Sequence, residues 1–464
     1  MKEKRQRRKR QPNLFLKCLV SVVALGAIVY FGSMAIKFCL SLFAVGDYVV
    51  TFPGEASPVV QKPAYTATEP VDENTGYVPP SEVARADLVV TGDLMLHLPI
   101  VRSGRVGNTY NFDGVFQYIT PYVSGADYAV VNLETTLSGT DGKEYTGYPK
   151  FNSPDAIVEA AANAGFDMML TANNHCNDYG TAGLKRTLEV VQEGGLAALG
   201  TVSSADAPHH VVKDVNGVKI GMVCYSYGQI GNDPDRPSMN DLPTDSAAAG
   251  LINAFDYDKV DLFYEKMTTQ IADMRAKGAE AIVLYIHWGD EYSTSVNDKQ
   301  KTIAQKMCDL GVDVIAGSHP HVVQEMALLT STADESHKTV CIYSMGNFLS
   351  NQRATNVDLT TGHTEDSLLL GLTFVKYSDG KVYLEGVTAQ PTWVLVRGSG
   401  NDRVYNILPL DYQGGDWEEK FDISSGQEED AKASYNRTME LIGSGLKTAQ
   451  EYLEQNRISR VGVG

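Results

Sequence analysis

The sequence predicts an α/β protein, and two observations lead to this class. From Ala86 onward, short runs of apolar residues alternate with longer amphipathic stretches, which is typical of strands and helices that follow one another along a chain. Most apolar runs stop abruptly at a glycine or a cluster of polar side chains, as strands do at the edge of an open sheet. Hydrophobic residues make up 43% of the chain and charged residues 21%, which is ordinary for a globular domain with a large core.

Each element follows from the local pattern. The apolar runs predict strands over residues 87–91, 127–131, 166–170, 218–225, 281–286, 312–316 and 339–343. Amphipathic stretches predict helices over residues 154–165, 181–194, 257–277, 298–310 and 430–456, and Thr181 is the expected N-cap of the second helix. A β-hairpin is predicted over residues 368–377 and 381–387, around the turn Ser378-Asp379-Gly380. The polar stretch over residues 228–250 is predicted to be a long loop.

The amino-terminal region predicts a membrane anchor. The first ten residues carry seven Lys or Arg side chains and one Glu, and residues 18–36 carry no charge. We therefore expect a basic cytoplasmic tail over residues 1–13 and a transmembrane signal-anchor over residues 14–45, which places the main domain outside the cytoplasm. A cleaved signal peptide that ends near Ala44-Val45-Gly46 is the alternative. Residues 46–85 contain many prolines and predict an extracytoplasmic linker.

The remainder of the chain is acidic. The net charge of the 464 residues is −18, so the chain beyond the basic tail carries about −24. This balance argues against nucleic-acid binding by a broad basic face. We expect one main domain over residues 86–400 and a partly helical C-terminal extension over residues 401–464.

Polar residues that can bind metals follow the predicted strands. Gly317-Ser318-His319-Pro320-His321 presents two imidazoles one residue apart on a turn, and similar clusters follow other strands. The predicted metal ligands are Asp93, Glu134, Asn174, His287, His319 and His321. Since ligands bind beyond the carboxyl ends of strands in open α/β sheets, we expect these side chains to converge. Mixed nitrogen and oxygen donors favour transition metals over calcium, with Glu134 able to bridge two ions. Taken singly, each residue also has a structural interpretation, such as a helix cap for Asp93 or a buried core histidine for His287.

Several motifs resemble those of the CapA family of poly-γ-glutamate capsule synthesis proteins, a branch of the calcineurin-like metallophosphoesterase superfamily. In order, they are Gly92-Asp93, Asn132-Leu133-Glu134, Asn173-Asn174-His175, His287-Trp288-Gly289, Gly317-Ser318-His319-Pro320-His321 and Tyr343-Ser344-Met345-Gly346-Asn347-Phe348. The resemblance runs over roughly residues 86–395. It implies a four-layer αββα sandwich that holds two divalent metal ions, Mn, Zn or Fe.

The resemblance also implies roles for individual residues. Asp93 and His321 would hold one metal ion, Asn174, His287 and His319 the other, and Glu134 would bridge them. His175 and Asn174 would be catalytic, with His175 acting as a general acid or orienting the substrate oxyanion. Asn132 and Asn347 would bind substrate. The Asp-x-His of the wider superfamily is Asp93-Leu94-Met95 here, so a histidine ligand is missing unless His97 supplies it.

Together these features predict a single-pass membrane protein with its N-terminus in the cytoplasm. The resemblance implies a role in making, exporting or attaching a poly-γ-glutamate-type polymer through a hydrolase-like site. The expected partners are an anionic envelope polymer, the membrane and the membrane subunits of a capsule synthase, but no nucleic acid. A non-catalytic scaffold of such a synthase and an extracellular phosphatase or phosphodiesterase are the alternatives.

Overall fold

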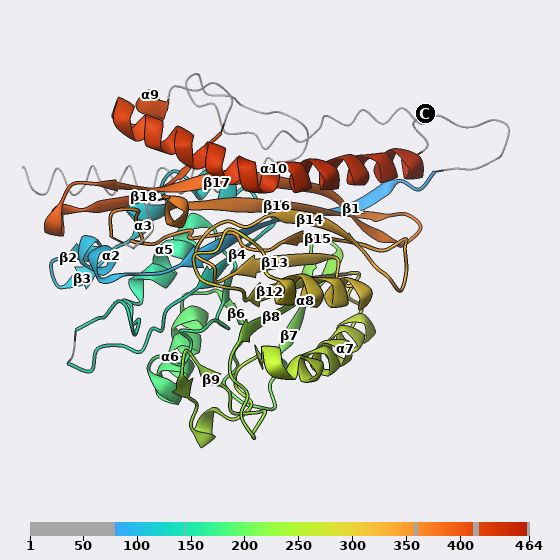
Figure 1. Ribbon diagram of the computed structural model, residues 1–464, viewed down its shortest axis with the longest axis horizontal. Coiled ribbons are helices and arrows are strands. Elements are labelled where there is room, and N and C mark those ends of the chain that lie inside the picture. The colour runs from blue at the N-terminus through green and yellow to red at the C-terminus, as the bar shows by residue number, and fades with distance from the viewer. Residues whose placement is uncertain (1–78, 143, 357–360, 412–416, 462–464) are drawn as a thin grey trace, which may run out of the picture. The chain divides into compact units, whose positions relative to one another are not determined.

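The computed structural model describes residues 79–142, 144–356, 361–411 and 417–461. The predicted basic tail and anchor, and the linker up to residue 78, lie outside these described residues. Within the described part of the chain, no helix combines the length and the apolar character needed to cross a membrane. The α/β class predicted from the sequence is confirmed, because strands and helices alternate along much of the described chain (Figure 1).

The first sheet has seven strands in the order β18-β17-β16-β1-β4-β5-β6. Its parallel half consists of β1 (Glu82–Leu94), β4 (Tyr128–Leu133), β5 (Met168–Leu170) and β6 (Ala197–Leu199). Its antiparallel half consists of β16 (Asp366–Tyr377), β17 (Val382–Arg397) and β18 (Val404–Pro409). The halves meet at β1, where Leu88 lies opposite Tyr128 of β4 on one side and Leu372 of β16 on the other.

The second sheet also has seven strands, with the main order β11-β8-β12-β13-β15-β14 and β7 paired to β8. Its parallel strands are β8 (Val218–Tyr227), β11 (Ala254–Phe255), β12 (Ala281–His287), β13 (Val314–Ser318) and β15 (Lys338–Ile342). The antiparallel strands are β7 (His210–Val215) and β14 (Met326–Thr330). Two separate ribbons, β2 (Arg105–Val106) with β3 (Thr109–Tyr110) and β9 (Ser238–Met239) with β10 (Leu242–Pro243), lie outside both sheets.

The two sheets share one apolar core, and each packs helices on its other face. In β12, Val283 and Tyr285 point into the shared core, whereas Ile282 and Leu284 point to the helices. This alternation follows from the two-residue period of a strand. The helices of the first sheet are α2 (Leu98–Ser103), α3 (Asp113–Phe116), α4 (Thr120–Val123), α5 (Ala156–Ala164) and α6 (Gly180–Glu193). The helices of the second sheet are α7 (Val260–Ala276) and α8 (Asp298–Asp309).

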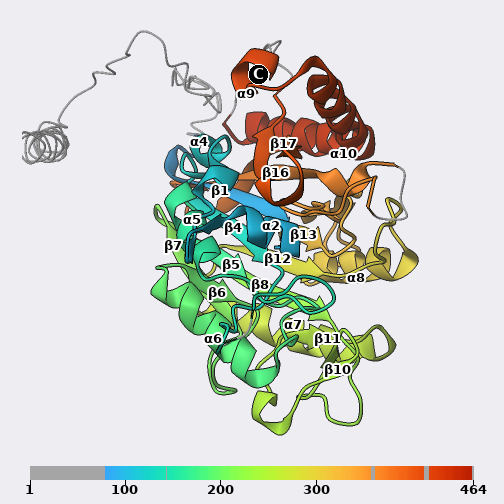
Figure 2. The same cartoon turned by 90° about the vertical axis from the view of Figure 1, so that its left-hand side faces the viewer.

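The residues after position 400 take part in both the first sheet and the shared core. β18 is the edge strand, and the short helix α9 (Trp417–Phe421) and the long helix α10 (Ser425–Val461) follow it. Ile442 and Leu446 of α10 belong to the core between the sheets, and α10 lies beside β16 and β17 in both views (Figures 1 and 2). Gly445 permits close contact with β14, since a Cβ at this position would lie 1.7 Å from the carbonyl oxygen of Met326.

One sequence-based detail is wrong. Thr181 does not cap α6, because this helix begins at Gly180 and its N-cap position, Tyr179, makes no side-chain capping hydrogen bond. The Thr181 hydroxyl instead donates to Asp245 Oδ1 at 2.6 Å. Asp245 lies in the predicted loop over residues 228–250, and this bond attaches the loop to α6.

Candidate metal centre

Parallel strands from both sheets carry the predicted ligands at their carboxyl ends. The ligands are Asp93 near the end of β1, Glu134 after β4, Asn174 after β5, His287 as the last residue of β12, and His319 and His321 after β13. Each of these side chains is buried, with at most 3% of its surface exposed. The sequence reasoning expected one rim, and the structure forms that rim from two facing sheets.

Two groups of ligand atoms meet at Glu134. One group consists of Glu134, His287 and His319, the other of Asp93, Glu134 and His321, and the ligand atoms of each group lie within 4.8 Å of one another. Glu134 Oε1 is 3.5 Å from His287 Nε2 and 3.7 Å from His321 Nε2. His321 Nδ1 is 3.3 Å from Asp93 Oδ2. This division is the one that the family resemblance implies, with Glu134 common to both groups.

Glu134 provides the test of whether a cation fits here. Its side chain is fully buried, and neither carboxylate oxygen has a hydrogen-bond partner. Burial, together with the nearby Asp93, raises the pKa of Glu134 well above its usual range. A buried carboxylate without partners is costly unless a positive charge lies beside it. The donor set of carboxylates and imidazoles therefore fits divalent transition metals.

The histidines differ in their charge environment. Burial lowers the pKa of His287 to about 3, and burial with the neighbouring histidines lowers that of His319 well below its usual range. These imidazoles are therefore neutral at neutral pH, which is the form that binds metals. Although burial alone would lower it, the carboxylates of Glu134 and Asp93 raise the pKa of His321 to about 9. This arrangement favours positive charge beside the two carboxylates.

The backbone is strained where the two histidines after β13 are placed. His319 has φ of 97° and His321 has φ of 59°, in the left-handed region that side chains other than glycine rarely adopt. Such strain persists only where the surrounding structure enforces it, and it is concentrated at functional sites. Here it aims both imidazoles into the cluster.

Two glycines permit close backbone contacts beside the ligands, one between the two sheets and one within the second sheet. The amide of Asp93 donates to the carbonyl of Gly346 at 2.9 Å. A Cβ on Gly92 would lie 2.1 Å from that same carbonyl oxygen, and a Cβ on Gly317 would lie 2.0 Å from the carbonyl oxygen of Tyr343. Only glycine at positions 92 and 317 lets the end of β1 and the end of β13 approach the segment after β15 so closely.

The proposed catalytic residues lie at the edge of this cluster. His175 Nδ1 is 2.8 Å from Asp178 Oδ2, so the ring is held at that nitrogen and its Nε2 is left for other contacts. Phe151 packs edge-on against His175, with 4.7 Å between ring centroids. His175 is buried and directly follows the predicted ligand Asn174 in the chain. Asn174 Oδ1 is 2.9 Å from His287 Nε2.

The two residues expected to bind substrate are buried and hydrogen-bonded within the protein. Asn132 Nδ2 donates to Asp93 Oδ1 at 2.8 Å and thereby orients that carboxylate. Asn347 Nδ2 donates to Gln352 Oε1 and to the carbonyl of Thr364, both at 2.9 Å. Contact of either residue with substrate stays a prediction; only the Asn132 side chain is seen to hold a predicted ligand.

His97 does not join the ligand groups. Its Nδ1 accepts from the amide of Asn351 at 3.3 Å, and its ring packs edge-on against Phe151 at 5.1 Å. Burial lowers the pKa of His97 to about 3. The position that carries histidine in the wider superfamily, Met95, is buried in the protein. Among the described residues, no histidine therefore takes the place of the missing ligand.

Comparison with known proteins assigns the family. A family model described as "Bacterial capsule synthesis protein PGA_cap" matches residues 87–352, which is more than half of the chain. The chain belongs to this family of bacterial capsule synthesis proteins. The matched region contains every predicted ligand and both predicted catalytic residues, whereas β16, β17, β18 and α10 lie beyond it.

Two curated relatives carry capsule names. The chain is 28% identical over 297 residues to "Capsule biosynthesis protein CapA" of Bacillus anthracis, covering 62% of this chain and 64% of that protein. It is 29% identical over 275 residues to "PGA biosynthesis protein CapA" of Bacillus subtilis (strain 168), covering 58% and 63%. The chain thus spans just under two thirds of each relative. Among solved structures, NAD nucleotidase of Haemophilus influenzae matches with a TM-score of 0.38 and 11% identity, covering 82% of this chain and 60% of that one.

Sequence reasoning missed two residues of this candidate site. The exposed carboxylate of Glu291 forms a third ligand group with His319 and His321. Asp178 is buried and holds His175. Both stand only a few residues from assigned positions, Glu291 after His287 and Asp178 after His175. Short spacing after a strand end was therefore the available signal for both.

Proposed function

We propose that this chain is a membrane-anchored, extracytoplasmic protein that acts on a poly-γ-glutamate-type capsule polymer through a metal-dependent, hydrolase-like site. Membership of the capsule synthesis family and the names of the two relatives support the capsule role. The basic tail and the uncharged stretch that follows it support the anchor. The protein would take part in the synthesis, export or attachment of the polymer. It would work beside the membrane subunits of a synthase.

The observation that carries the proposal is the unpartnered carboxylate of Glu134 between two ligand groups. Asp93 and His321 would hold one ion, His287, His319 and Asn174 the other, and Glu134 would contact both. Two such ions supply Lewis acidity and lower the pKa of bound water, which suits hydrolysis of an amide or a phosphoester. Asn132 keeps Asp93 in place through its 2.8 Å hydrogen bond.

The chain's own residues would move the proton of the reaction. Asp178 fixes the tautomer and orientation of His175 through Nδ1, as a carboxylate partner does in other acid–base sites. With Nδ1–H held by Asp178, His175 in its imidazolium form would donate the Nε2 proton to the leaving nitrogen of a γ-glutamyl amide and become neutral. Phe151 limits rotation of that ring by packing on it edge-on.

The exposed side of the site carries a carboxylate. Glu291 is exposed, whereas the ligands around it are buried. An anionic polymer that approaches this side meets that negative charge in addition to the acidic domain, so bound cations would have to offset the repulsion. Binding of the polymer at the cluster should therefore depend on metal.

The experiment measures metal content and polymer output together. Full-length protein in detergent, wild type and His319→Ala, is loaded with manganese, zinc or iron and analysed by mass spectrometry, with His363→Ala as a matched control outside the cluster. We expect up to two equivalents of metal in the wild type and in the control, and a loss of at least one in His319→Ala. In cells, His319→Ala should abolish polymer output. Metal-free wild type after loading, or normal polymer output from His319→Ala, would contradict the proposal.

A further inference from the structure

Two tyrosines pack against the two histidines that follow β13. The ring centroid of Tyr227, the last residue of β8, lies 4.6 Å from that of His319. The ring centroid of Tyr292 lies 5.9 Å from that of His321. Both histidines are buried, whereas both tyrosines are half-buried. Each tyrosine therefore lies between one predicted ligand and the solvent.

The backbone holds Tyr292 beside the ligands. Its amide donates to the carbonyl of Pro320 at 2.7 Å, which attaches Tyr292 to the turn that carries both histidines. Its φ of 64° lies in the left-handed region, which side chains other than glycine rarely adopt. Such strain is concentrated at functional sites, so this conformation points to a role for the side chain.

Two consecutive hydrogen bonds orient the hydroxyl of Tyr292. Asn347 Nδ2 donates to Gln352 Oε1 at 2.9 Å, and Gln352 Nε2 donates to Tyr292 Oη at 3.0 Å. The phenol oxygen is thus an acceptor in this contact, and its own proton remains to be donated. Among the described residues, no acceptor takes that proton, and the hydroxyl of Tyr227 has no hydrogen-bond partner.

We infer that Tyr227 and Tyr292 bind an oxyanion of the substrate at the metal centre by donating hydrogen bonds from their hydroxyls. This role deepens the proposed function and rests on it. Phenols are protonated at neutral pH, so each can donate to a carboxylate, a phosphate oxygen or the oxyanion of a tetrahedral intermediate. Neutral donors also suit a position beside the exposed Glu291, because a lysine or arginine there would pair with that carboxylate instead.

The same contacts give Asn347 an indirect part in substrate binding. Asn347 is fully buried and holds Gln352, which in turn holds Tyr292. Asn347 and Gln352 are therefore positioning residues, since they act on the substrate only through the phenol.

The test is titration calorimetry with inorganic phosphate as the oxyanion. The full-length protein in detergent is loaded with manganese and freed of excess metal, and metal-free protein gives the background. We expect the metal-loaded wild type to bind phosphate. Tyr227→Phe and Tyr292→Phe should each weaken this binding about tenfold, because each variant keeps the ring and loses one hydrogen bond to a charged oxygen. Their metal content, measured by mass spectrometry on the same samples, should equal that of the wild type.

Gln352→Met tests the hydrogen-bonded positioning separately. It removes the donor to Tyr292 at similar side-chain length and should weaken phosphate binding about threefold. In the Tyr292→Phe background, the same change should have no further effect, since Gln352 acts only through that hydroxyl. An equal loss in both backgrounds would show a structural role and contradict the positioning by Gln352.

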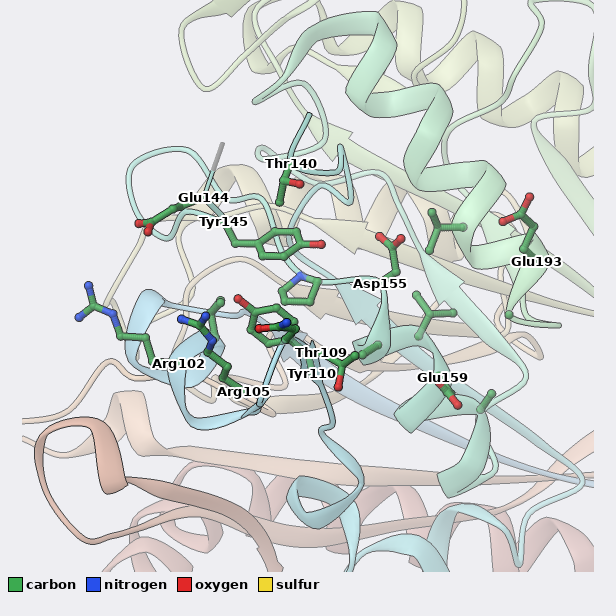
Figure 3. A pocket seen from close by; sticks show the side chains of 18 of the residues that line it. Arg102, Arg105, Thr109, Tyr110, Thr140, Glu144, Tyr145, Asp155, Glu159 and Glu193 are labelled. Atoms are coloured by element: carbon green, nitrogen blue, oxygen red, sulfur yellow. The ribbon is translucent and has the colours of Figure 1, made fainter. Parts of the chain in front are cut away.

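The matched control is Tyr110→Phe. Tyr110 lines a surface groove that none of the predicted ligands lines (Figure 3), so loss of its hydroxyl should leave phosphate affinity unchanged. Unchanged phosphate affinity in both Tyr227→Phe and Tyr292→Phe, or no phosphate binding by metal-loaded wild type, would overturn the inference and leave the metal centre standing. Wild type that takes up no metal would contradict the proposed function, and the inference with it.

Discussion

Replacing Glu134 by glutamine should change stability in opposite directions with and without metal. In metal-free protein, the variant removes a buried carboxyl group whose two oxygens have no partner. Because burial raises the pKa of Glu134 well above its usual range, folding at neutral pH requires proton uptake there, and this lowers stability by about 1–3 kcal/mol, a cost that glutamine does not have. The free energy of unfolding of the metal-free variant should therefore rise by about 1–3 kcal/mol.

In metal-loaded protein, the same change should destabilise. Glu134 belongs to both buried ligand groups, so its loss weakens both sites. An ion present at 100 to 1,000 times its Kd stabilises the folded state by about 2.7–4.1 kcal/mol, and the variant should lose much of this for each ion.

The assay is urea unfolding of the full-length protein, with chelator and with saturating manganese, followed by the fluorescence of its three buried tryptophans, Trp288, Trp393 and Trp417. The control is Glu189→Gln, which replaces an exposed glutamate of α6. It should leave the free energy of unfolding unchanged both with chelator and with manganese. If Glu134→Gln lowered stability equally with and without metal, Glu134 would be a structural residue and the reasoning would fail.

Three further predictions concern stability. Burial raises the pKa of Asp366 to about 6, above the roughly 3.9 of an aspartate in an unfolded chain. Protonated Asp366 therefore contributes stability that is fully present below about pH 4 and is lost as the pH rises through 6. Arg437→Met, which removes the bidentate partner of Asp366, should deepen this loss and cost about 3–5 kcal/mol at pH 8 but less at pH 5 by urea unfolding. Gly445→Ala should lower the free energy of unfolding by about 1–3 kcal/mol, because a Cβ there meets a carbonyl of β14. Gly443→Ala, where a Cβ has space, should be neutral or stabilising by up to about 1 kcal/mol. An unchanged calorimetric Tm for both variants would contradict the packing argument. Chelation should lower the Tm of the wild type reversibly, and a Tm insensitive to both chelator and added metal would be the contrary result.

The strands that the sequence predicted well are the buried ones. The run over residues 281–286 became β12, and the run over residues 312–316 became β13 with a shift of two residues at each end. Strands buried on both faces appear as continuous apolar runs, which is a strong signal. The missed strands of the two sheets lie at or near sheet edges, where polar residues are tolerated: β7, β14 and β18 are antiparallel, and β6 and β11 are short parallel strands.

The division into two sheets was not available from periodicity. A continuous apolar run indicates that a strand is buried on both faces, but it does not show which neighbour the strand pairs with. The contact between Gly92 and Gly346, which joins the two sheets, links positions more than 250 residues apart. Only the family resemblance implied the two facing sheets.

The candidate site was predictable because its ligands follow buried strands. The parts that sequence reasoning missed depend on turn geometry and on strand register. Glu291 reaches the cluster because the chain turns back at Tyr292, whose φ is 64°. A turn of this kind has no distinctive composition when it contains no glycine or asparagine. The partnership of Asn132 with Asp93 spans two neighbouring strands and likewise needed the register of the sheet.

The C-terminal helix, which lies outside the region that matches the family model, is connected to the metal centre by a short series of contacts. Arg437 of α10 binds the carboxylate of Asp366 with two hydrogen bonds, at 2.8 and 2.7 Å. The backbone carbonyl of Asp366 accepts from the amide of Asn347 at 3.2 Å, and the carbonyl of Gly346 accepts from the amide of Asp93 at 2.9 Å. Because these contacts are consecutive, α10 supports the segment that fixes the position of a predicted metal ligand. A predicted metal ligand of this chain, Asp93, is therefore held in place in part by a helix beyond the family match.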